Sequence, residues 1–119
     1  MASLLDPQAR RRQLEQAQAL FNAGEYWLAH EALETVWRSI IDDGERRVWQ
    51  GVIQAAAALL HQRRGNRHGT VVLGAAALEK LSGPQHRAVE FDTLRFRATL
   101  ARALAGEGDP PRLEFRSDA

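Results

Sequence analysis

His30 and Glu34 are four residues apart, so on a helix both side chains can reach one point beside the axis. Imidazole and carboxylate groups are ligands of zinc and of similar divalent metals. His61, from a second predicted helix, would complete a set of two histidines and one carboxylate, which is typical of catalytic zinc sites. The local spacing, however, is His-Glu-x-x-Glu and differs from the His-Glu-x-x-His of zinc peptidases.

In this metal-site interpretation, Glu31 is the candidate catalytic base, and Gln50 and Gln54 orient the ligands or the substrate. Glu31 points about 100° away from His30 around the helix, toward the more polar side. The alternative interpretation is a closed polar core, in which Glu34 accepts hydrogen bonds from Gln54, a tryptophan indole or an imidazole. At the level of sequence both interpretations stay open.

The positions of these polar side chains predict that they are buried together. His30 and Glu34 lie on an apolar arc of their helix, bounded by Tyr26, Leu33, Trp37 and Ile41 on one side and by Trp27 on the other. The polar residues of the second helix fall within about 40° of one another on a surface that is otherwise apolar or alanine. Because buried polar groups need partners, the two stripes are expected to face each other. The expected polar cluster comprises His30, Glu34, Gln50, Gln54 and His61.

Five helices are predicted to position this cluster. Asp6 and Pro7 form a typical helix start, Gly24 supplies a left-handed stop, and Asn66 can cap a later helix. The segment Asp42-Asp43-Gly44 is expected to separate the second helix from the third. The predicted ranges are 7–23, 25–41, 45–64, 66–81 and 92–105. Since no segment shows extended β periodicity, the fold class is an all-α bundle of two antiparallel helical hairpins plus flanking helices.

The chain is expected to form a single helical domain over residues 1–119, with an extended tail over 109–119. Two consecutive prolines prevent a helix in the tail. Leu113 and Phe115 alternate with charged residues there, so the tail should form a strap that presses these two side chains onto the bundle.

The last predicted helix carries two separate apolar stripes. The first comprises Leu94, Ala98, Ala101 and Leu104, and the second comprises Phe96 and Leu100. Burying both stripes requires a second partner surface. We therefore expect a homodimer; if the strap covers the second stripe instead, a monomer results.

The composition is that of an ordinary globular protein, with 45% hydrophobic and 26% charged residues in 119. Sixteen basic and fifteen acidic residues give a net charge of +1, which argues against a strong nucleic-acid or membrane field. The chain has no cysteine, which excludes disulfides, a thiolate nucleophile and sulfur-ligated zinc. Any divalent metal, such as zinc, would need His, Asp or Glu ligands.

The first residues, Met-Ala-Ser-Leu-Leu-Asp-Pro, lack the charged and apolar regions of a signal peptide. The longest run of apolar residues and glycine, Val71 to Leu78, is much shorter than the roughly 20 residues that span a bilayer. A cytoplasmic location without membrane insertion is therefore expected.

Three motifs occur in order: Phe21-Asn-x-Gly24-x-Tyr26-x-x-Ala29-His30-Glu31-x-x-Glu34-x-x-Trp37-Arg38, then Gln50-Gly51-x-Ile53-Gln54-x-Ala56-Ala57, then Gly65-Asn66-x-x-Gly69. Together they resemble the domain of unknown function 309 family over about residues 21–81. The resemblance implies a small, all-helical prokaryotic protein without an established activity. Members are sometimes labelled predicted metal-dependent hydrolases, a label that rests on the His-Glu pattern.

These observations favour a binding or interaction module that self-associates and is organised around the polar cluster. The alternative is a metal-dependent hydrolase that uses His30, Glu34 and His61. Nucleic-acid binding through the arginines is the weakest hypothesis, because these residues are spread over several elements. The three tryptophans, Trp27, Trp37 and Trp49, are expected to fill the core. The sequence identifies neither a substrate nor a small-molecule ligand.

Overall fold

The computed structural model describes residues 5–116, so the first four residues and the last three of the predicted tail lie outside the described part. The helices are α1 (Pro7–Asn22), α2 (Tyr26–Ser39), α3 (Asp43–Arg63), α4 (Arg67–Lys80) and α5 (Thr93–Leu104). Their ends agree with the predicted ranges to within two residues. The described residues form no β-strand, and the prediction of an all-α bundle is confirmed.

Side-chain caps set most of the helix starts. Asp6, Asp42, Asn66 and Asp92 each accept a hydrogen bond from the backbone N–H three residues later. The hydrogen bond from the Glu45 N–H to Asp42, together with His86 at 2.9 Å, holds the pKa of this carboxyl below its ordinary value. The capped helix α3 therefore begins before Glu45, where it was expected to start, and includes Asp43 and Gly44 in its first turn.

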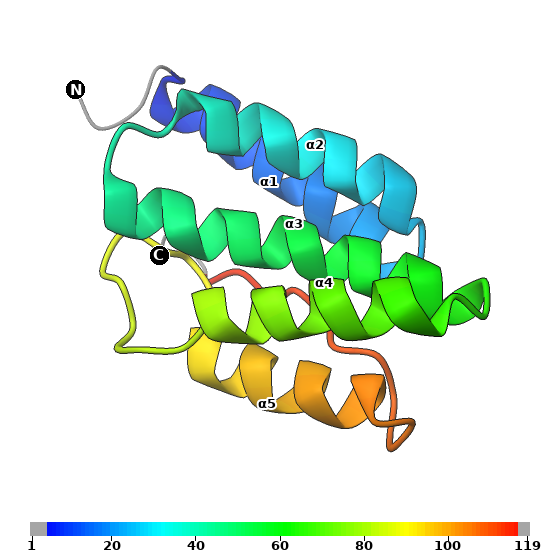
Figure 1. Cartoon of the computed structure of the whole chain (residues 1–119). Helices are drawn as coiled ribbons and strands as arrows, with labels where there is room; N and C mark the ends of the chain where they lie inside the picture. Colours follow the sequence, from blue (N-terminus) through cyan, green and yellow to red (C-terminus); the bar gives the residue numbers. More distant parts are fainter. Residues whose placement is uncertain (1–4, 117–119) are drawn as a thin grey trace.

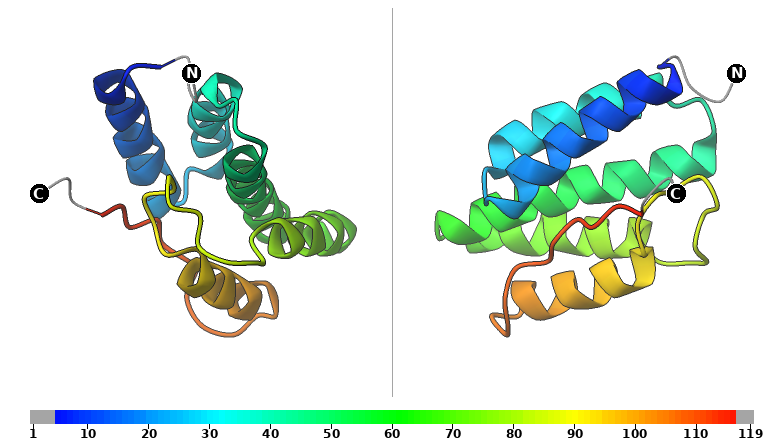
Figure 2. Two further views of the ribbon diagram at one scale, coloured as in Figure 1. Left: turned by 90° about the vertical axis from the view of Figure 1, so that its left-hand side faces the viewer. Right: turned by 180° about the vertical axis from the view of Figure 1, so that it is seen from behind.

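The helices are arranged around α3. Helices α1 and α2 form one antiparallel hairpin, and α3 and α4 form another; α2 and α4 thus run in the same direction on either side of α3 (Figure 1). The end-on view of Figure 2 places α3 between α2 and α4, with α5 beneath the second hairpin. Helices α2 and α4 do not pack extensively against each other.

The hydrophobic core lies on the other side of α3, between α1, α2 and α5. Trp49 is fully buried there, with its ring centroid 5.5 Å from Phe91 and 6.2 Å from Phe115. Phe96 joins the same aromatic group at 5.5 Å from Phe91. The expectation that Trp49 fills the core is confirmed.

The C-terminal strap, residues 109–116, crosses behind α3 between α1 and α5 (Figure 2). Leu113 is fully buried, and Phe115 packs against the core, as predicted. Side chains of α1 bind both the N–H and the carbonyl of Leu113. The N–H donates to Asn22 Oδ1 at 2.8 Å, and the carbonyl accepts hydrogen bonds from Asn22 and Gln18. The strap is thus an integral layer of the bundle.

Helix α5 buries a different stripe from the one expected. Phe96 and Leu100 are buried in the interior of the bundle, whereas Leu94 is 71% exposed and Ala98 is exposed. The prediction that Leu94 and Ala98 belong to the buried face is therefore wrong. Phe96 packs against Phe21 and Phe91 of the same chain, and Leu100 is fully buried, so these residues no longer argue for a dimer.

A buried ion-pair network joins α1, α3 and the segment before α5. Arg10 forms a two-pronged hydrogen-bonded pair with Glu90, both contacts being 2.8 Å, and its Nη1 lies 2.7 Å from Glu45 Oε2. Glu45 is only 3% exposed. Burial opposes the charge of Arg10, but hydrogen bonding and attraction from Glu90 and Glu45 outweigh it and raise the pKa of the guanidinium.

Candidate functional site

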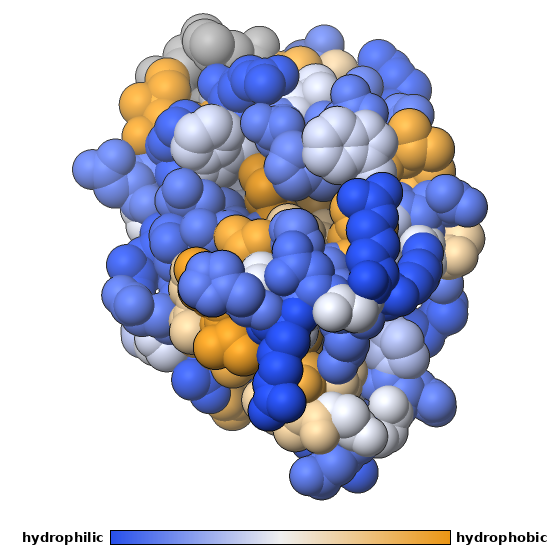
Figure 3. Space-filling view, turned by 45° about the vertical axis from the view of Figure 1, so that its right-hand side comes forward, coloured by the Kyte–Doolittle hydropathy of each residue, from blue (hydrophilic) through white to orange (hydrophobic). Residues whose placement is uncertain are grey.

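A strip of α3 is left partly uncovered between α2 and α4. Helical geometry places four half-buried residues of α3 on the arc between the faces that contact α2 and α4. They are Gln50, Gln54, Ala57 and His61. Trp27, His30, Glu34 and Trp37 of α2 form one wall, and Gly69, Val72 and Ala76 of α4 form the other. On this side Figure 3 shows apolar side chains in a shallow hollow between hydrophilic ones. We call this feature the α2–α4 groove.

The predicted polar cluster lines this groove, but only part of it is in direct contact. His30 Nδ1 lies 3.3 Å from Glu34 Oε1, and Arg38 donates a 3.3 Å hydrogen bond to Glu34 Oε2. The side chains of His30 and Glu34 are 25% and 28% exposed, which is less buried than expected. Arg46 of α3 contacts Trp37 of α2, which fixes the register of these two antiparallel helices. One helical turn further along α3, Gln50 is level with Glu34, and after a second turn Gln54 is level with His30.

Three buried polar atoms of the groove lack a hydrogen-bond partner within the protein. They are His30 Nδ1, Trp37 Nε1 and Gln54 Oε1. The contact between His30 and Glu34 brings the atoms close without the alignment of a hydrogen bond, so Nδ1 remains unsatisfied. Unsatisfied buried polar atoms are uncommon in folded proteins and each needs an explanation.

His61 forms a hydrogen bond with Asn66 at the turn between α3 and α4. Asn66 Oδ1 accepts from the Gly69 N–H at 3.0 Å, which fixes the orientation of the amide. The amide nitrogen then donates to His61 Nδ1 at 3.0 Å, so the neutral tautomer with its proton on Nε2 fits this arrangement. His61 therefore stabilises the α3–α4 turn, and its Nδ1 is not available to a ligand.

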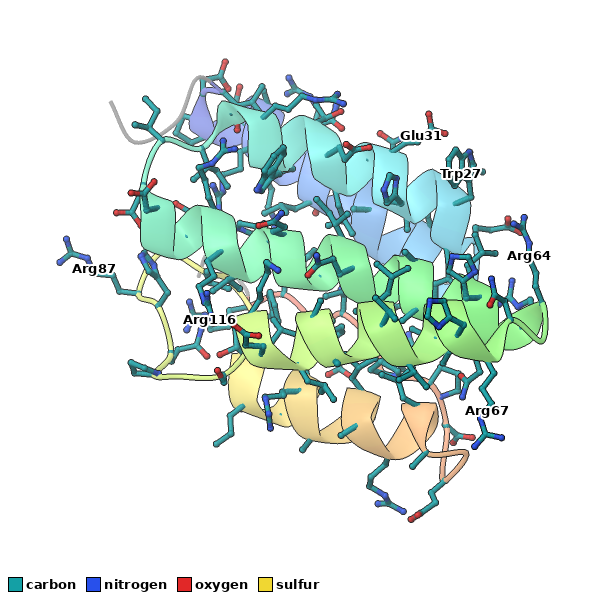
Figure 4. All side chains as sticks on the ribbon, in the orientation of Figure 1. Trp27, Glu31, Arg64, Arg67, Arg87 and Arg116 are labelled. Carbon is teal, nitrogen blue, oxygen red and sulfur yellow. The ribbon has the colours of Figure 1, made fainter. Side chains whose placement is uncertain are left out.

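These residues do not fit the three-ligand zinc site. Residues 5–116 contain no group of three or more His, Cys, Asp or Glu side chains placed to hold a metal ion. His30 and Glu34 are together, but His61 is paired with Asn66. The candidate base, Glu31, is exposed and lies on the outer side of α2 (Figure 4).

Close packing between His61 and Gly69 gives a direct test of this geometry. A Cβ at position 69 would lie 2.7 Å from His61 Cγ, which is too close for the ring to stay in place. We expect Gly69→Ala to destabilise the fold by about 1–3 kcal/mol, measured by urea denaturation. In a His61→Ala background the same change should cost little, because the clash is gone. A stabilised single variant would contradict the packing described here.

Trp27 is the unexpected aromatic residue of the groove. Its ring stacks on His30, with the centroids 5.4 Å apart and the planes 6° from parallel, yet Trp27 is 58% exposed. The prediction that it fills the core is wrong. Trp27 lies about 100° from Tyr26, the nearest residue of the buried stripe of α2, and so points away from the core.

Several arginines have structural roles that the sequence pattern did not reveal. Arg46 covers the Trp37 ring at 4.1 Å and donates to the carbonyls of Trp37 and Ile40 at the end of α2. Arg63 lies 4.8 Å from the centroid of the Tyr26 ring and donates to the Gly24 carbonyl at 2.7 Å. The local signal for such roles is an arginine beside a helix end, where carbonyls lack partners.

A hollow of about 810 Å³ lies elsewhere, between the start of α5, the preceding loop and the strap. Phe91 and Phe96 form part of its lining, and its charged residues comprise three arginines and three acidic residues. The lining is Gly83, Pro84, Gln85, Phe91, Asp92, Leu94, Arg95, Phe96, Thr99, Asp109, Pro110, Arg112, Glu114 and Arg116. The hollow does not include the predicted polar cluster.

The family model described as "Domain of unknown function (DUF309)" matches residues 14–73. The chain belongs to the DUF309 family. The DUF309 match spans most of α1, all of α2 and α3, and half of α4, and so contains nearly all of the groove residues. The resemblance inferred from the three sequence motifs is therefore confirmed.

Two curated proteins are similar to this DUF309 chain. An uncharacterized protein of Aquifex aeolicus is 32% identical over 106 residues, which cover 86% of this chain and 31% of the relative. The uncharacterized protein YpuF of Bacillus subtilis is 41% identical over 66 residues, which cover 56% of this chain and 37% of the relative. The chain thus spans about a third of the length of these relatives. No solved structure matches it. Within residues 5–116, no helix is long and apolar enough to cross a membrane.

Proposed function

We propose that this DUF309 domain is a protein-interaction module whose α2–α4 groove receives a helical segment of a partner. The observation that carries the proposal is that apolar side chains are exposed at both edges of the groove, while buried polar atoms between them have no hydrogen-bond partner within the protein. Trp27 and Val72, on opposite edges, are 58% and 51% exposed. Between them, buried atoms of His30 and Gln54 lack hydrogen-bond partners within the protein. A partner that covers these edges would remove apolar surface from water and could satisfy the polar atoms.

The shape of the groove favours a helix over a small molecule. Small ligands usually occupy enclosed cavities, whereas the hollow of about 810 Å³ lies elsewhere and the α2–α4 groove is the space between two helices that run in the same direction. An amphipathic helix laid in a hydrophobic groove is a common mode of recognition. The alternative, a metal-dependent hydrolase that uses His30, Glu34 and His61, has no assembled ligand group among the described residues.

A labelling experiment tests whether the groove is covered in the cell. The chain has no cysteine, so a single introduced thiol can be followed alone. Val72 faces the groove, whereas Val71, 61% exposed, lies about 100° further round α4 on the side of α5. We expect maleimide to label the Val72→Cys variant several-fold more slowly than Val71→Cys in the cells that produce the protein.

The comparison has internal controls. Both variants should label at similar rates in the purified protein at nanomolar concentration, where a weakly bound partner has dissociated. Equal labelling of the two variants in cells would show that nothing covers the groove, and would overturn the proposed function.

A further inference from the structure

The outer faces of α2 and α4, beside the α2–α4 groove, carry two stripes with identical spacing, in which every residue except the half-buried Glu34 is exposed. Along α2 the stripe consists of Trp27, Glu31, Glu34 and Arg38; along α4 it consists of His68, Val72, Ala75 and Glu79. Each follows the positions i, i+4, i+7 and i+11, which lie on one side of a helix. Both outer ends are well exposed, since the side chains of Arg38 and Glu79 are 67% and 76% exposed.

The two stripes are also level with each other along the groove. The turns before α2 and α4 are adjacent, because Arg63 at the end of α3 donates to the Gly24 carbonyl at 2.7 Å. Gly24 and Gly65 occupy equivalent positions in these turns, with φ of 81° and 74°. Because α2 and α4 run in the same direction from these turns (Figure 1), and counterparts in the two stripes lie the same number of residues beyond Gly24 and Gly65, we place each residue of the α2 stripe at the height of its counterpart in α4.

We infer that the groove is covered by a second copy of this chain, related by a two-fold axis parallel to the groove, so that α2 of each copy lies on α4 of the other and the two grooves face each other. This inference rests on the proposed function in that the groove is a protein-interaction surface; the helices that cover it are α2 and α4 of the second copy, which lie on its edges. A two-fold axis in this direction exchanges the two edges and keeps the height of every residue, which makes the surface self-complementary. The α2 stripe of each copy therefore meets the α4 stripe of the other, so that the same contact occurs twice in the dimer.

The matched residues carry no like charges, although Glu31 meets the apolar Val72 of the second copy. Arg38 meets Glu79 of the second copy, which pairs opposite charges at one end of the groove. The side chains of Trp27 and Glu34 meet His68 and the small Ala75, so the helices can approach closely. Within one copy these charges are only weakly engaged, with 3.3 Å from Arg38 to Glu34 and 3.7 Å from Arg47 to Glu79.

Sedimentation equilibrium of the purified protein, with charge-swap variants, tests the inference. We expect a dimer of the 13.3 kDa chain at micromolar concentration. Arg38→Glu and Glu79→Arg should each raise the dissociation constant about tenfold or more, and the double variant should recover most of the loss. Val72→Glu should abolish the dimer, while the matched variant Val71→Glu should leave it intact. Circular dichroism verifies that each variant is folded.

The outcomes separate this inference from the proposed function. A protein that stays monomeric at hundreds of micromolar, or a dimer broken by Val71→Glu but not by Val72→Glu, overturns the second copy as partner. A double charge swap without recovery overturns the stated register. If the protein is monomeric but Val72→Cys is still protected in cells, the groove binds another protein and only the self-association is wrong.

Discussion

Replacing Glu45 with alanine is expected to destabilise the fold by about 3 kcal/mol or more, because it leaves Arg10 charged and buried beside one remaining acidic partner. The side chain of Glu45 is 4% exposed and that of Arg10 is 14% exposed, so water cannot replace the lost carboxylate. Chemical denaturation at neutral pH measures the change as a lower midpoint with an unchanged slope.

The exposed pair on the neighbouring turn provides the control. Arg11 and Glu15 lie 3.6 Å apart, and Glu15 is 58% exposed. Glu15→Ala should change the free energy of unfolding by less than about 1 kcal/mol. If Glu45→Ala had an effect as small as that of Glu15→Ala, the buried network would not contribute to stability as described.

Leu113→Ala is expected to cost about 2–5 kcal/mol, although position 113 lies in an extended segment near the end of the described chain. Leu113 is fully buried, and the two hydrogen bonds to its carbonyl hold the strap in place, so the cavity left by alanine cannot close easily. Thermal unfolding should show a lower midpoint. Limited proteolysis should in addition show faster cleavage within residues 109–116.

The adjacent residue Glu114 is exposed and serves as the matched control. Glu114→Ala should stay within about 0.5 kcal/mol of the parent. Equal stability of the two variants would mean that the strap only rests on the bundle.

Most of the helix limits could be predicted from the sequence, because they depend on neighbouring residues. Asp6, Asn66 and Gly24 act on backbone groups within a few positions, and such interactions leave a local pattern. The choice of the buried stripe on α5 could not be predicted in this way. Phe96 and Leu94 are both apolar residues at suitable positions, and tertiary packing decides between them, since Phe96 contacts the ring of Phe21 in α1, 75 positions earlier.

In the candidate site too, contacts within one helix could be predicted from the sequence, whereas contacts set by other parts of the chain could not. The placement of His30 and Glu34 four residues apart on one helix predicts their proximity, which the structure has at 3.3 Å. Helical spacing predicts that His61 belongs to the same site, because it lies on the matching face of α3. A local interaction with Asn66, five residues later, competes for its ring, and helical periodicity does not include side-chain pairs across a turn. The Arg10–Glu90 pair spans 80 positions, so no window of sequence reveals it.

The anchoring of the strap also determines the order in which this protein can complete its fold. Leu113 is held by Gln18 and Asn22, residues that precede it by 95 and 91 positions. During synthesis α1 leaves the ribosome long before its partner exists, and the aromatic group around Trp49 stays open on that side until the strap arrives. Because closing so long a loop costs more entropy than forming a helix, these contacts are expected to form after the helices.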